Sequence, residues 1–396
     1  MSFEIALSGI QAINQQLEAT SNNIANAGTY GFKSSRANFS AMYAGAQATG
    51  VEVGSMTQTI NQNGGVLTTG RGMDAAIDGR GFFVSRDSQG LMAYSRVGIF
   101  SANKDGYLVD SNDRRAQGYA AVTSGATLGA MGDIKVPTGQ IAAVASTKVA
   151  YVGNLSADWT PPVVTPINTA NANSYNMSKQ SIVYDSLGTQ HTVSQYFVKT
   201  GPGAVTVHYA FDGAAPSATA NLTFNAQGQL TAPLAPVALT LAAPGNGAAP
   251  LAFTVDYTGT TQFAGEAITT TNSTNGYASG TFVGVELAQD GSVIAKYSND
   301  QQQTVATLAL ATFADEGALT ATSDTSWSES AGSGVALYGV AGTGLTGKLN
   351  TGALERSNVD ITSELVGLMT SQRNYQANSK VISTQNTMLQ ALMQAL

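Results

Sequence analysis

Apolar side chains recur every seven residues at both ends of this 396-residue chain. Near the start, one row of such positions is apolar throughout: Phe3, Ile10, Leu17 and Ile24. A second row, offset by four residues, begins with Leu7 and turns polar at Asn14 and Ser21. Such spacing places both rows on one face of an α-helix, as in the seam of a coiled coil. The pattern predicts a helix within 1–28 that ends near Asn26 or Gly28, where an Asn-Ala-Gly sequence supplies a left-handed residue.

The last segment of the chain repeats this arrangement with two rows of its own. Its apolar row consists of Ile361, Leu368, Tyr375, Ile382, Leu389 and Leu396. Its second row begins and ends with an apolar residue and is polar between them; it consists of Leu365, Gln372, Ser379, Asn386 and Met393. Thr362 has the side chain of an N-cap, so we expect a helix over 361–396, about 50 Å long at 1.5 Å per residue.

The pattern of these rows leaves two interpretations open. Either each helix packs its apolar face on its own domain, or the helices of several chains share a coiled-coil layer. Polar residues inside such a seam lower its stability but fix register and partner number, and a helix of about 25 residues with such a seam is marginal alone. Under the second interpretation the apolar positions form a subunit–subunit seam. The polar positions then face either neighbouring helices or a wet channel; they are Asn14, Ser21, Gln372, Ser379 and Asn386.

Between the two predicted helices, short strand-like runs alternate with turn signals. The turns contain Gly after Asp, Asn or Gln, and lie at 87–90, 104–106, 185–188, 225–228 and 289–291. Residues 205–211 alternate apolar and polar, which predicts a half-buried strand with His208 on its solvated face. A similar alternation predicts a hairpin over 283–297 with Val283 and Val293 on its buried face.

Composition changes divide the chain into parts. Residues 30–72 are rich in Gly, Asn, Gln and Thr with little periodicity, which favours an extended connector. A Pro-rich segment at 159–166 and a Thr/Asn/Gly tract at 258–281 flank a β-rich block that resembles an insert. We therefore expect a multidomain α+β fold, in which paired N- and C-terminal α-helices form a coiled-coil-like core, followed by two mainly-β domains, the outer inserted in the inner.

Each expected part except the insert is built from two segments. The bounds are 1–28 and 361–396 for the terminal helical core, 29–71 and 349–360 for the connector, 72–147 and 281–348 for the inner β-domain, and 148–280 for the outer β-domain.

The composition argues against most catalytic and metal chemistry. With no Cys and 2 His, thiolate zinc sites and disulfides are excluded and His-ligated metals lack material. A net charge of -7, with no basic cluster denser than Arg114-Arg115, argues against a nucleic-acid partner. We expect no enzyme activity, no cofactor and no metal site. Only 11% of residues are charged, which favours self-association because little like-charge repulsion keeps copies apart.

Three features imitate functional sites. Gly342–Gly347 matches the dinucleotide fingerprint, but the polar stretch after it lacks the helical period that a pyrophosphate site needs. Asn103–Gly106 imitates part of a calcium loop, but Asn112 stands where a bidentate carboxylate is required, and a hairpin turn explains it better. Acid pairs such as Asp74 with Asp78 are expected by chance among 25 acids.

Neither a transmembrane segment nor a cleavable signal is expected. The longest uncharged stretch, 213–255, is broken by five Pro and by many polar residues. The first 32 residues contain Glu4 and Glu18 and no basic residue, unlike a secretory signal. We expect no membrane insertion, and a protein that stays in the cytosol or leaves by another route.

Several motifs near the two ends carry a family resemblance. They are 6–10, 21–26, 30–36, 70–83, 94–100, 357–361 and 372–378. Together they closely resemble segments of the bacterial flagellar rod, hook and hook-associated axial proteins. Within that family the chain is similar to the hook proteins in its length and its insert, and 298–301 and 333–337 also resemble hook-protein segments. The alternatives are another axial component, such as a rod or junction protein, and, outside the family, a secreted β-rich adhesin.

This resemblance implies a structural function. Many copies would polymerise into a short, curved, hollow tube that acts as a universal joint, transmitting motor torque from rod to filament. It also implies partners: further copies of the chain, the distal rod protein, the hook–filament junction protein, the hook cap protein and the flagellar type III export apparatus. The resemblance places the protein outside the cell, in the hook and basal body of the flagellum, exported without a cleavable signal peptide.

Overall fold

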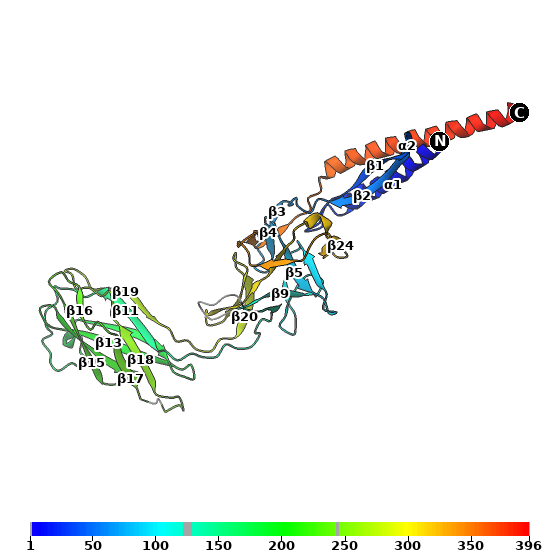
Figure 1. The fold of residues 1–396 in the computed structure, drawn as a ribbon. Helices are drawn as coiled ribbons and strands as arrows, with labels where there is room; N and C mark the ends of the chain where they lie inside the picture. Colours follow the sequence, from blue (N-terminus) through cyan, green and yellow to red (C-terminus); the bar gives the residue numbers. More distant parts are fainter. Residues whose placement is uncertain (1, 122–128, 243–244, 396) are drawn as a thin grey trace. The chain divides into compact units, whose positions relative to one another are not determined.

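The computed structural model describes residues 2–121, 129–242 and 245–395. Within this part of the chain, one helix stands at each end and β-strands form most of the middle (Figure 1). The chain forms two compact units. The first consists of 1–138, 283–296 and 302–396, and the second of 139–282 and 297–301. The expected multidomain α+β fold is confirmed, and the bounds expected for the insert, 148–280, fall inside the second unit.

Both terminal helices are present, as α1 (Ser2–Ala25) and α2 (Ile361–Ala395). The N-cap of α2 is Asp360 rather than Thr362, because its Oδ1 accepts a hydrogen bond from the Thr362 backbone N–H at 2.9 Å. An Asp carboxylate is at least as good an N-cap as Thr. The left-handed residue that we expected near Asn26 or Gly28 lies further along the chain. Turns continue past Ala25 until Gly31, whose φ is 68°.

The predicted connector contains a long β-hairpin that the sequence analysis missed. Strands β1 (Ser35–Ala44) and β2 (Gln47–Gln58) pair antiparallel with two register shifts, and both pack against α1. Most positions on these strands are exposed or half-buried on both faces. A strand without a buried face has no alternation of apolar and polar residues, so no period-2 signal marked it.

The remaining strands of the first unit form one large sheet and two small ones. The large sheet follows the order β20-β21-β22-β9-β5-β6-β25-β24, with β7, β8, β10, β23 and β26 beside this path. In the small sheets β27 pairs with β4 and β28 with β3, so the segment that leads into α2 pairs with the segment that follows the hairpin. The bounds are β3 (Val66–Thr68), β4 (Ala75–Asp78), β5 (Phe82–Arg86), β6 (Met92–Ser95), β7 (Ser101–Ala102), β8 (Leu108–Val109), β9 (Arg115–Ala120), β10 (Met131–Asp133), β20 (Phe282–Leu287), β21 (Ser292–Tyr297), β22 (Gln302–Leu308), β23 (Leu310–Thr312), β24 (Thr320–Thr322), β25 (Ser326–Ser328), β26 (Leu337–Gly339), β27 (Lys348–Thr351) and β28 (Ala353–Glu355).

An aromatic cluster fills part of the core of this unit. The Phe82 ring meets the rings of Phe313 and Trp327 edge-on, at centroid distances of 6.0 and 5.6 Å. Tyr94 meets Phe313 in the same way at 4.8 Å. Edge-to-face pairs of this kind add to the stabilisation that comes from burial alone.

Local predictions in this unit are partly confirmed. The hairpin expected over 283–297 is formed by β20 and β21, and Val293 is buried, but Val283 is exposed because β20 is the edge strand of the sheet. Gly342–Gly347 forms a turn between β26 and β27, closed by a hydrogen bond from Gly342 N–H to Gly347 O at 2.9 Å. Asn103 accepts the Asp105 N–H at 3.0 Å in the turn between β7 and β8, as the hairpin-turn interpretation predicts.

The second unit contains two sheets that enclose one apolar core. One has the order β17-β18-β11-β19 and the other runs from β12 to β16 in sequence order. Val205, Val207 and Tyr209 are buried in the core, as the alternation over 205–211 predicts, while His208 is half-buried on the other face. The bounds are β11 (Lys148–Asn154), β12 (Met177–Tyr184), β13 (Gln190–Gly201), β14 (Ala204–Phe211), β15 (Ala218–Phe224), β16 (Leu230–Ala232), β17 (Val237–Leu241), β18 (Leu251–Asp256) and β19 (Ile268–Thr274).

His191 of the second unit lies between two carboxylates. Its Nδ1 is 2.8 Å from Asp212 Oδ2, and its Nε2 is 3.3 Å from Asp185 Oδ2. Burial lowers the pKa of His191, but hydrogen bonds to Asp212 and Asp185 outweigh burial and raise that pKa overall. The imidazole therefore ties the β12–β13 turn to the end of β14.

Candidate assembly surface

The two terminal helices pack side by side in antiparallel directions (Figure 1). Asn23 Nδ2 donates to Glu364 Oε1 at 2.9 Å, and Gly9 lies against Asn378. Fourteen residues separate these two contacts on each helix, so the register is constant. A Cβ on Gly9 would lie 3.0 Å from Asn378 Nδ2, which means that a glycine allows the two helices their close approach at this point.

Mostly small and polar residues are buried on the two helices, where α1 contacts both α2 and the hairpin. The buried residues of α1 are Ala6, Gly9, Ala12, Ile13, Ala19, Thr20 and Asn23. Ser371 is buried on α2, and the half-buried residues include Glu364, Leu368, Asn378, Ile382 and Gln385. The contacts within the chain thus bury mainly small and polar side chains of the helices, and most of their large apolar side chains stay exposed or half-buried.

The structure places the predicted seam positions in two groups. Ile10, Leu17, Ile24, Leu368 and Ile382 are half-buried, and Phe3, Leu7, Ile361, Leu365, Tyr375, Leu389 and Met393 are exposed. The predicted polar positions Asn14, Ser21, Gln372, Ser379 and Asn386 are all exposed. Leu396 lies outside the described residues. Ser371 and Asn378 of α2 take part in the contact within the chain, and each comes one residue before a position of the predicted second row. Of the predicted first row, only Leu368 and Ile382 are covered in the same way.

Further exposed apolar residues lie on the same elements. They are Ile5 of α1, Phe39, Met42, Tyr43 and Met56 of the hairpin, and Val366, Met369, Val381, Met388 and Leu392 of α2. Soluble monomers rarely expose large apolar patches, and such patches usually mark interaction sites. The helices and the hairpin together therefore form a candidate surface for contacts with other molecules.

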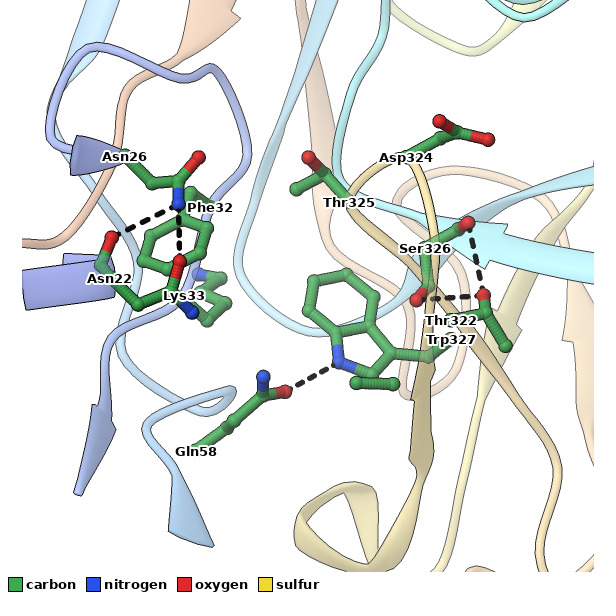
Figure 2. Close-up of a pocket in the computed structure, with 11 residues that line it drawn as sticks. Asn22, Asn26, Phe32, Lys33, Gln58, Thr322, Asp324, Thr325, Ser326 and Trp327 are labelled. Carbon is green, nitrogen blue, oxygen red and sulfur yellow. Dashed lines mark hydrogen bonds between the residues drawn. The ribbon is translucent and has the colours of Figure 1, made fainter. Parts of the chain in front are cut away.

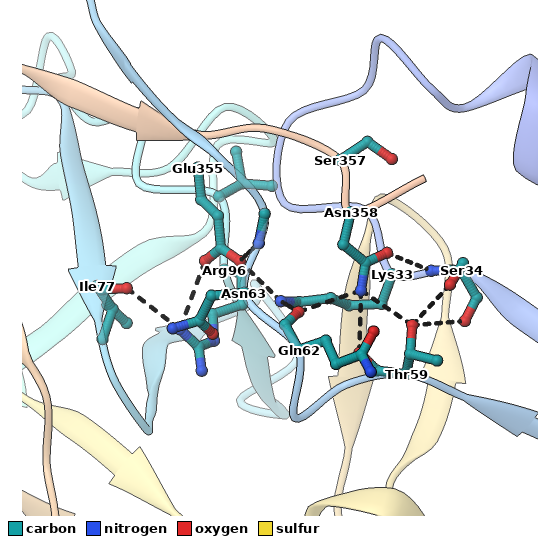
Figure 3. Close-up of polar contacts among 12 residues, drawn as sticks. Lys33, Ser34, Thr59, Gln62, Asn63, Ile77, Arg96, Glu355, Ser357 and Asn358 are labelled. Atoms are coloured by element: carbon teal, nitrogen blue, oxygen red, sulfur yellow. Dashed lines mark hydrogen bonds and ion pairs between the residues drawn. The ribbon is translucent and has the colours of Figure 1, made fainter. Parts of the chain in front are cut away.

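A buried ionic junction lies at the base of these elements (Figure 3). Glu355 Oε1 accepts hydrogen bonds from Lys33 Nζ at 2.7 Å and from the Gly64 N–H at 3.0 Å. Glu355 Oε2 accepts one from Arg96 at 3.4 Å. The side chains of Lys33, Arg96 and Glu355 are at most 1% exposed. The carboxylate therefore joins the segment after α1, the segment before α2 and the loop that follows β6.

Two cations share this single carboxylate at the centre of the junction. Burial lowers the pKa of Lys33 and of Arg96, and the charge of Glu355 opposes that effect at both. The Arg96 guanidinium also donates to Gly79 O at 2.9 Å and lies 5.3 Å from the centroid of the Phe82 ring. Glu355 is thus the group on which the charge balance of the junction depends.

Two buried or half-buried amides extend the junction to both helices. Asn358 Oδ1 accepts the Ser34 N–H at 2.8 Å, and its Nδ2 donates to Thr59 Oγ1 at 2.9 Å (Figure 3). Asn23 Oδ1 accepts the Ser35 N–H at 2.9 Å, while its Nδ2 reaches α2 as described above. These bonds fix the end of α1, the start of α2 and the base of the hairpin to one another.

The sequence patterns do not predict these junction roles. Lys33, Arg96, Asn23 and Asn358 all stand in the motifs that carry the family resemblance. The signal in the sequence is the position of Lys33 and Arg96 within these motifs, in a chain with only 11% charged residues. Glu355 lies two residues before the C-terminal motif and carried no signal of its own.

A pocket of about 400 Å³ lies beside Trp327, within the same unit. Figure 2 shows Asn22 and Asn26 on one side and the indole of Trp327 on the other, with Trp327 Nε1 donating to Gln58 Oε1 at 2.8 Å. The turn between β24 and β25 places Asp324 and Thr325 in the left-handed region, at φ 65° and 53°. Two consecutive left-handed residues are the geometry of the tight hairpin turn, and this turn forms one rim of the pocket.

Comparisons with known proteins match most of the chain to flagellar families. The family model described as "Flagella basal body rod protein" matches 3–33, and "Flagellar hook protein FlgE/F/G D1 domain" matches 76–157. "Flagellar basal body protein FlaE D2 domain" matches 154–277, and "Flagellar basal body rod FlgEFG protein C-terminal" matches 350–395.

Relatives that match over their full length distinguish hook proteins from the other flagellar proteins that these family models cover. The flagellar hook protein FlgE of Escherichia coli is 39% identical over 404 residues, which cover 99% of each chain. That of Salmonella typhimurium is 39% identical over 405 residues with the same coverage. That of Rhizobium meliloti is 31% identical, covering 98% of this chain and 97% of its own. The chain belongs to the flagellar hook protein family.

A solved structure agrees at the level of the fold. The crystal structure of Helicobacter pylori flagellar hook protein FlgE2 has a TM-score of 0.51 at 13% sequence identity, and covers 72% of this chain and 98% of its own. Membership of the hook family makes the chain a structural subunit of the bacterial flagellar hook and not an enzyme. As such it self-polymerises and acts as part of the flagellar basal body and hook. No helix in the described part of the chain meets the length and hydropathy needed to cross a membrane.

Proposed function

We propose that α1, α2 and the hairpin make the contacts between copies that build the tube wall of the hook. One observation carries this proposal. The chain packs its own helices through small and polar residues, and leaves large apolar residues such as Leu365, Tyr375 and Leu389 exposed. Removal of apolar surface from water is the main driving force for association, so these side chains favour a polymer over a lone subunit.

The four-part organisation expected from the sequence belongs to this proposal. The terminal helices form a coiled-coil-like core, the segments 29–71 and 349–360 connect it to the inner β-domain, and the outer β-domain is inserted in the inner one. The seam consists of Phe3, Leu7, Ile10, Leu17, Ile24, Ile361, Leu365, Leu368, Tyr375, Ile382, Leu389, Met393 and Leu396. The exposed polar positions of the helices face either neighbouring helices or the channel.

This organisation supports a mechanism for bending. Each protofilament of a curved, rotating tube lengthens and shortens on every turn, while the tube still transmits torque. The apolar contacts of the helices provide the persistent part of the wall. The β-domains shift against those of neighbouring copies through smaller, more polar interfaces, as domains joined by weak interfaces do. The buried junction at Glu355 holds the helices to the inner β-domain during this motion.

The remaining partners follow from the position of a hook in the flagellum. The tube joins the distal rod protein at one end and the hook–filament junction protein at the other, and subunits add beneath a hook cap protein. Subunits reach the growing tip outside the cell through the flagellar type III export apparatus, without cleavage of a signal peptide. A chain with no Cys suits this route, because no disulfide forms to obstruct an unfolded chain.

Electron microscopy of a strain that lacks the gene tests this function. We expect rods without hooks and filaments, and hooks restored when the chain is expressed again. Deletion cells that still carry hooks, or that lack rods as well, would contradict the assignment. The first result would place the chain elsewhere on the cell, and the second would place it in the rod.

A further inference from the structure

The second helix extends beyond the first. Asn23 lies beside Glu364 and Gly9 beside Asn378, and continuing this register places Ser2 opposite Gln385. Gln385 is also the last residue of α2 that is half-buried rather than exposed, among those whose side chains are described. The helix continues to Ala395. The remaining ten residues, here called the overhang (386–395), add about 15 Å of helix, and Figure 1 shows this end of α2 running past the start of α1.

The overhang is uncharged and exposes four large apolar side chains. Met388, Leu389, Leu392 and Met393 expose 65%, 59%, 60% and 75% of their surfaces. No charged residue occurs anywhere from Val381 to the end of the sequence. An isolated helical segment of this length is marginal in water, so its apolar side chains favour a partner that covers them.

An uncharged groove lies along the contact between the helices, where Gly9 approaches Asn378. It has a volume of about 410 Å³ and is lined by residues of α1, α2 and the hairpin. Six of them have small or apolar side chains, and three are amides: Gly9, Ala12, Ile13, Phe39, Val51 and Ala377, with Gln16, Asn374 and Asn378. No charged residue lines it among those described. Gly9, Ala12 and Ile13 of its lining are buried, and Phe39 is 46% exposed. We call it the helix–hairpin groove.

The overhang cannot reach the groove of its own chain. Ala377 and Leu389 lie on the same continuous helix, twelve residues and about 18 Å apart. An overhang that occupies this groove therefore comes from another copy of the chain. Because groove and overhang both lack charge, their contact desolvates no ionised group, whereas a charged partner segment would lose its hydration without gaining an ion pair.

We propose that the overhang of one copy seats in the helix–hairpin groove of a second copy of this chain. Each copy offers one overhang and one groove, and we place them on different neighbours, so that the contact is heterologous and repeats head to tail. Such a contact builds an open helical polymer when its rotation does not close a ring. The inference rests on the proposed function, since it names the particular contact that links successive subunits of the tube.

Disulfide trapping tests this contact, and the absence of native Cys makes the chain a suitable background. Chains carrying Met393→Cys are mixed with chains carrying Phe39→Cys, polymerised together and oxidised. A disulfide needs Cα atoms about 4.4–6.8 Å apart. We expect a covalent dimer that contains one chain of each kind, and a ladder of longer covalent multimers from chains that carry both substitutions. Leu91→Cys is the control: it lies on the β5–β6 turn of the same unit and is more exposed than Phe39, at 65% against 46%. It should give no dimer with Met393→Cys.

The outcomes separate this inference from the proposed function. Normal tubes without the mixed dimer, or with as much dimer from Leu91→Cys, would overturn the inference and leave the proposed function intact. If the first pair of substitutions prevents assembly, a second pair, Leu389→Cys with Val51→Cys, replaces it. A mixed dimer from this pair supports the contact. Tubes that form without that dimer contradict it. Failure of the unsubstituted chain to form any tube would instead contradict the proposed function.

Discussion

Replacing Glu355 with Gln is expected to lower the free energy of unfolding of the helix-bearing unit by about 3–5 kcal/mol, the usual cost of removing one partner from a buried ion pair. The substitution leaves the charges of Lys33 and Arg96 inside the protein with no counter-charge in direct contact. Since whole domains are stable by only about 5–15 kcal/mol, this single change removes a large share of the total. The helices should then lose their fixed attachment to the inner β-sheet.

The tryptophan positions allow this unit to be followed separately. Trp159 lies in the second unit and Trp327 in the core of the first, and the sequence has 2 Trp. In a Trp159→Phe background, Trp327 fluorescence during urea unfolding reports on the first unit alone. Asp105→Asn removes one negative charge from an exposed turn of the same unit and serves as the control.

A second variant tests whether charge imbalance is the cause. Lys33→Met leaves Arg96 and Glu355 as a balanced pair, and the long apolar side chain of Met occupies much of the same space. We expect its loss of unfolding free energy to be clearly smaller than that of Glu355→Gln. Equal losses for the two variants, or a loss near zero for Glu355→Gln, would show that the junction does not act through its charges.

Substituting Leu365 or Tyr375 by Asp is expected to abolish tube formation while leaving the subunit folded. Both side chains are exposed in the single chain, so a carboxylate there stays hydrated and changes stability little, within about 0.5 kcal/mol. In the polymer the same carboxylate would be buried against an apolar neighbour, which is strongly unfavourable for an unpaired charge. The control is Gln376→Asp, which adds the same charge to the exposed residue next to Tyr375 and outside both predicted rows.

Sedimentation and electron microscopy measure the assembled fraction at equal protein concentration. Urea unfolding of the soluble protein confirms that each variant is folded. Wild-type amounts of tube from Leu365→Asp and Tyr375→Asp would remove these positions from the seam. Loss of assembly in Gln376→Asp as well would show that added charge anywhere on α2, rather than the apolar rows, is what assembly cannot tolerate.

The features that the sequence predicted were those with a local pattern. Seven-residue rows predicted both helices, and the alternation of Val205, Val207 and Tyr209 predicted a strand of the second unit. In each case one face of the element is apolar and the opposite face is polar, so the sequence has a regular period. The β1–β2 hairpin has no such face: Phe39, Tyr43 and Met56 are exposed on strands that lack a buried side. Its apolar residues have no regular spacing, so the sequence pattern favours a connector there rather than strands.

The junction was beyond prediction for a different reason. Lys33 and Glu355 are 322 residues apart in the sequence, and nothing in the residues around Glu355 indicates which cation it meets. The offset of one residue between the predicted and observed contact rows of α2 has a related cause. Glycine and alanine at Gly9 and Ala12 bring the helices together through small residues, whereas a search for apolar periodicity selects the large residues on the neighbouring face.

The central claim is that the apolar faces of the terminal helices are covered only when copies assemble. Amide hydrogen exchange of residues 365–392, compared between purified subunits and assembled tubes, tests it most directly. A helix whose apolar face lacks a partner is marginal, so these amides should exchange with little protection in the free subunit and become strongly protected in the tube. Strong protection already present in the free subunit, with no further gain in the tube, would contradict the account.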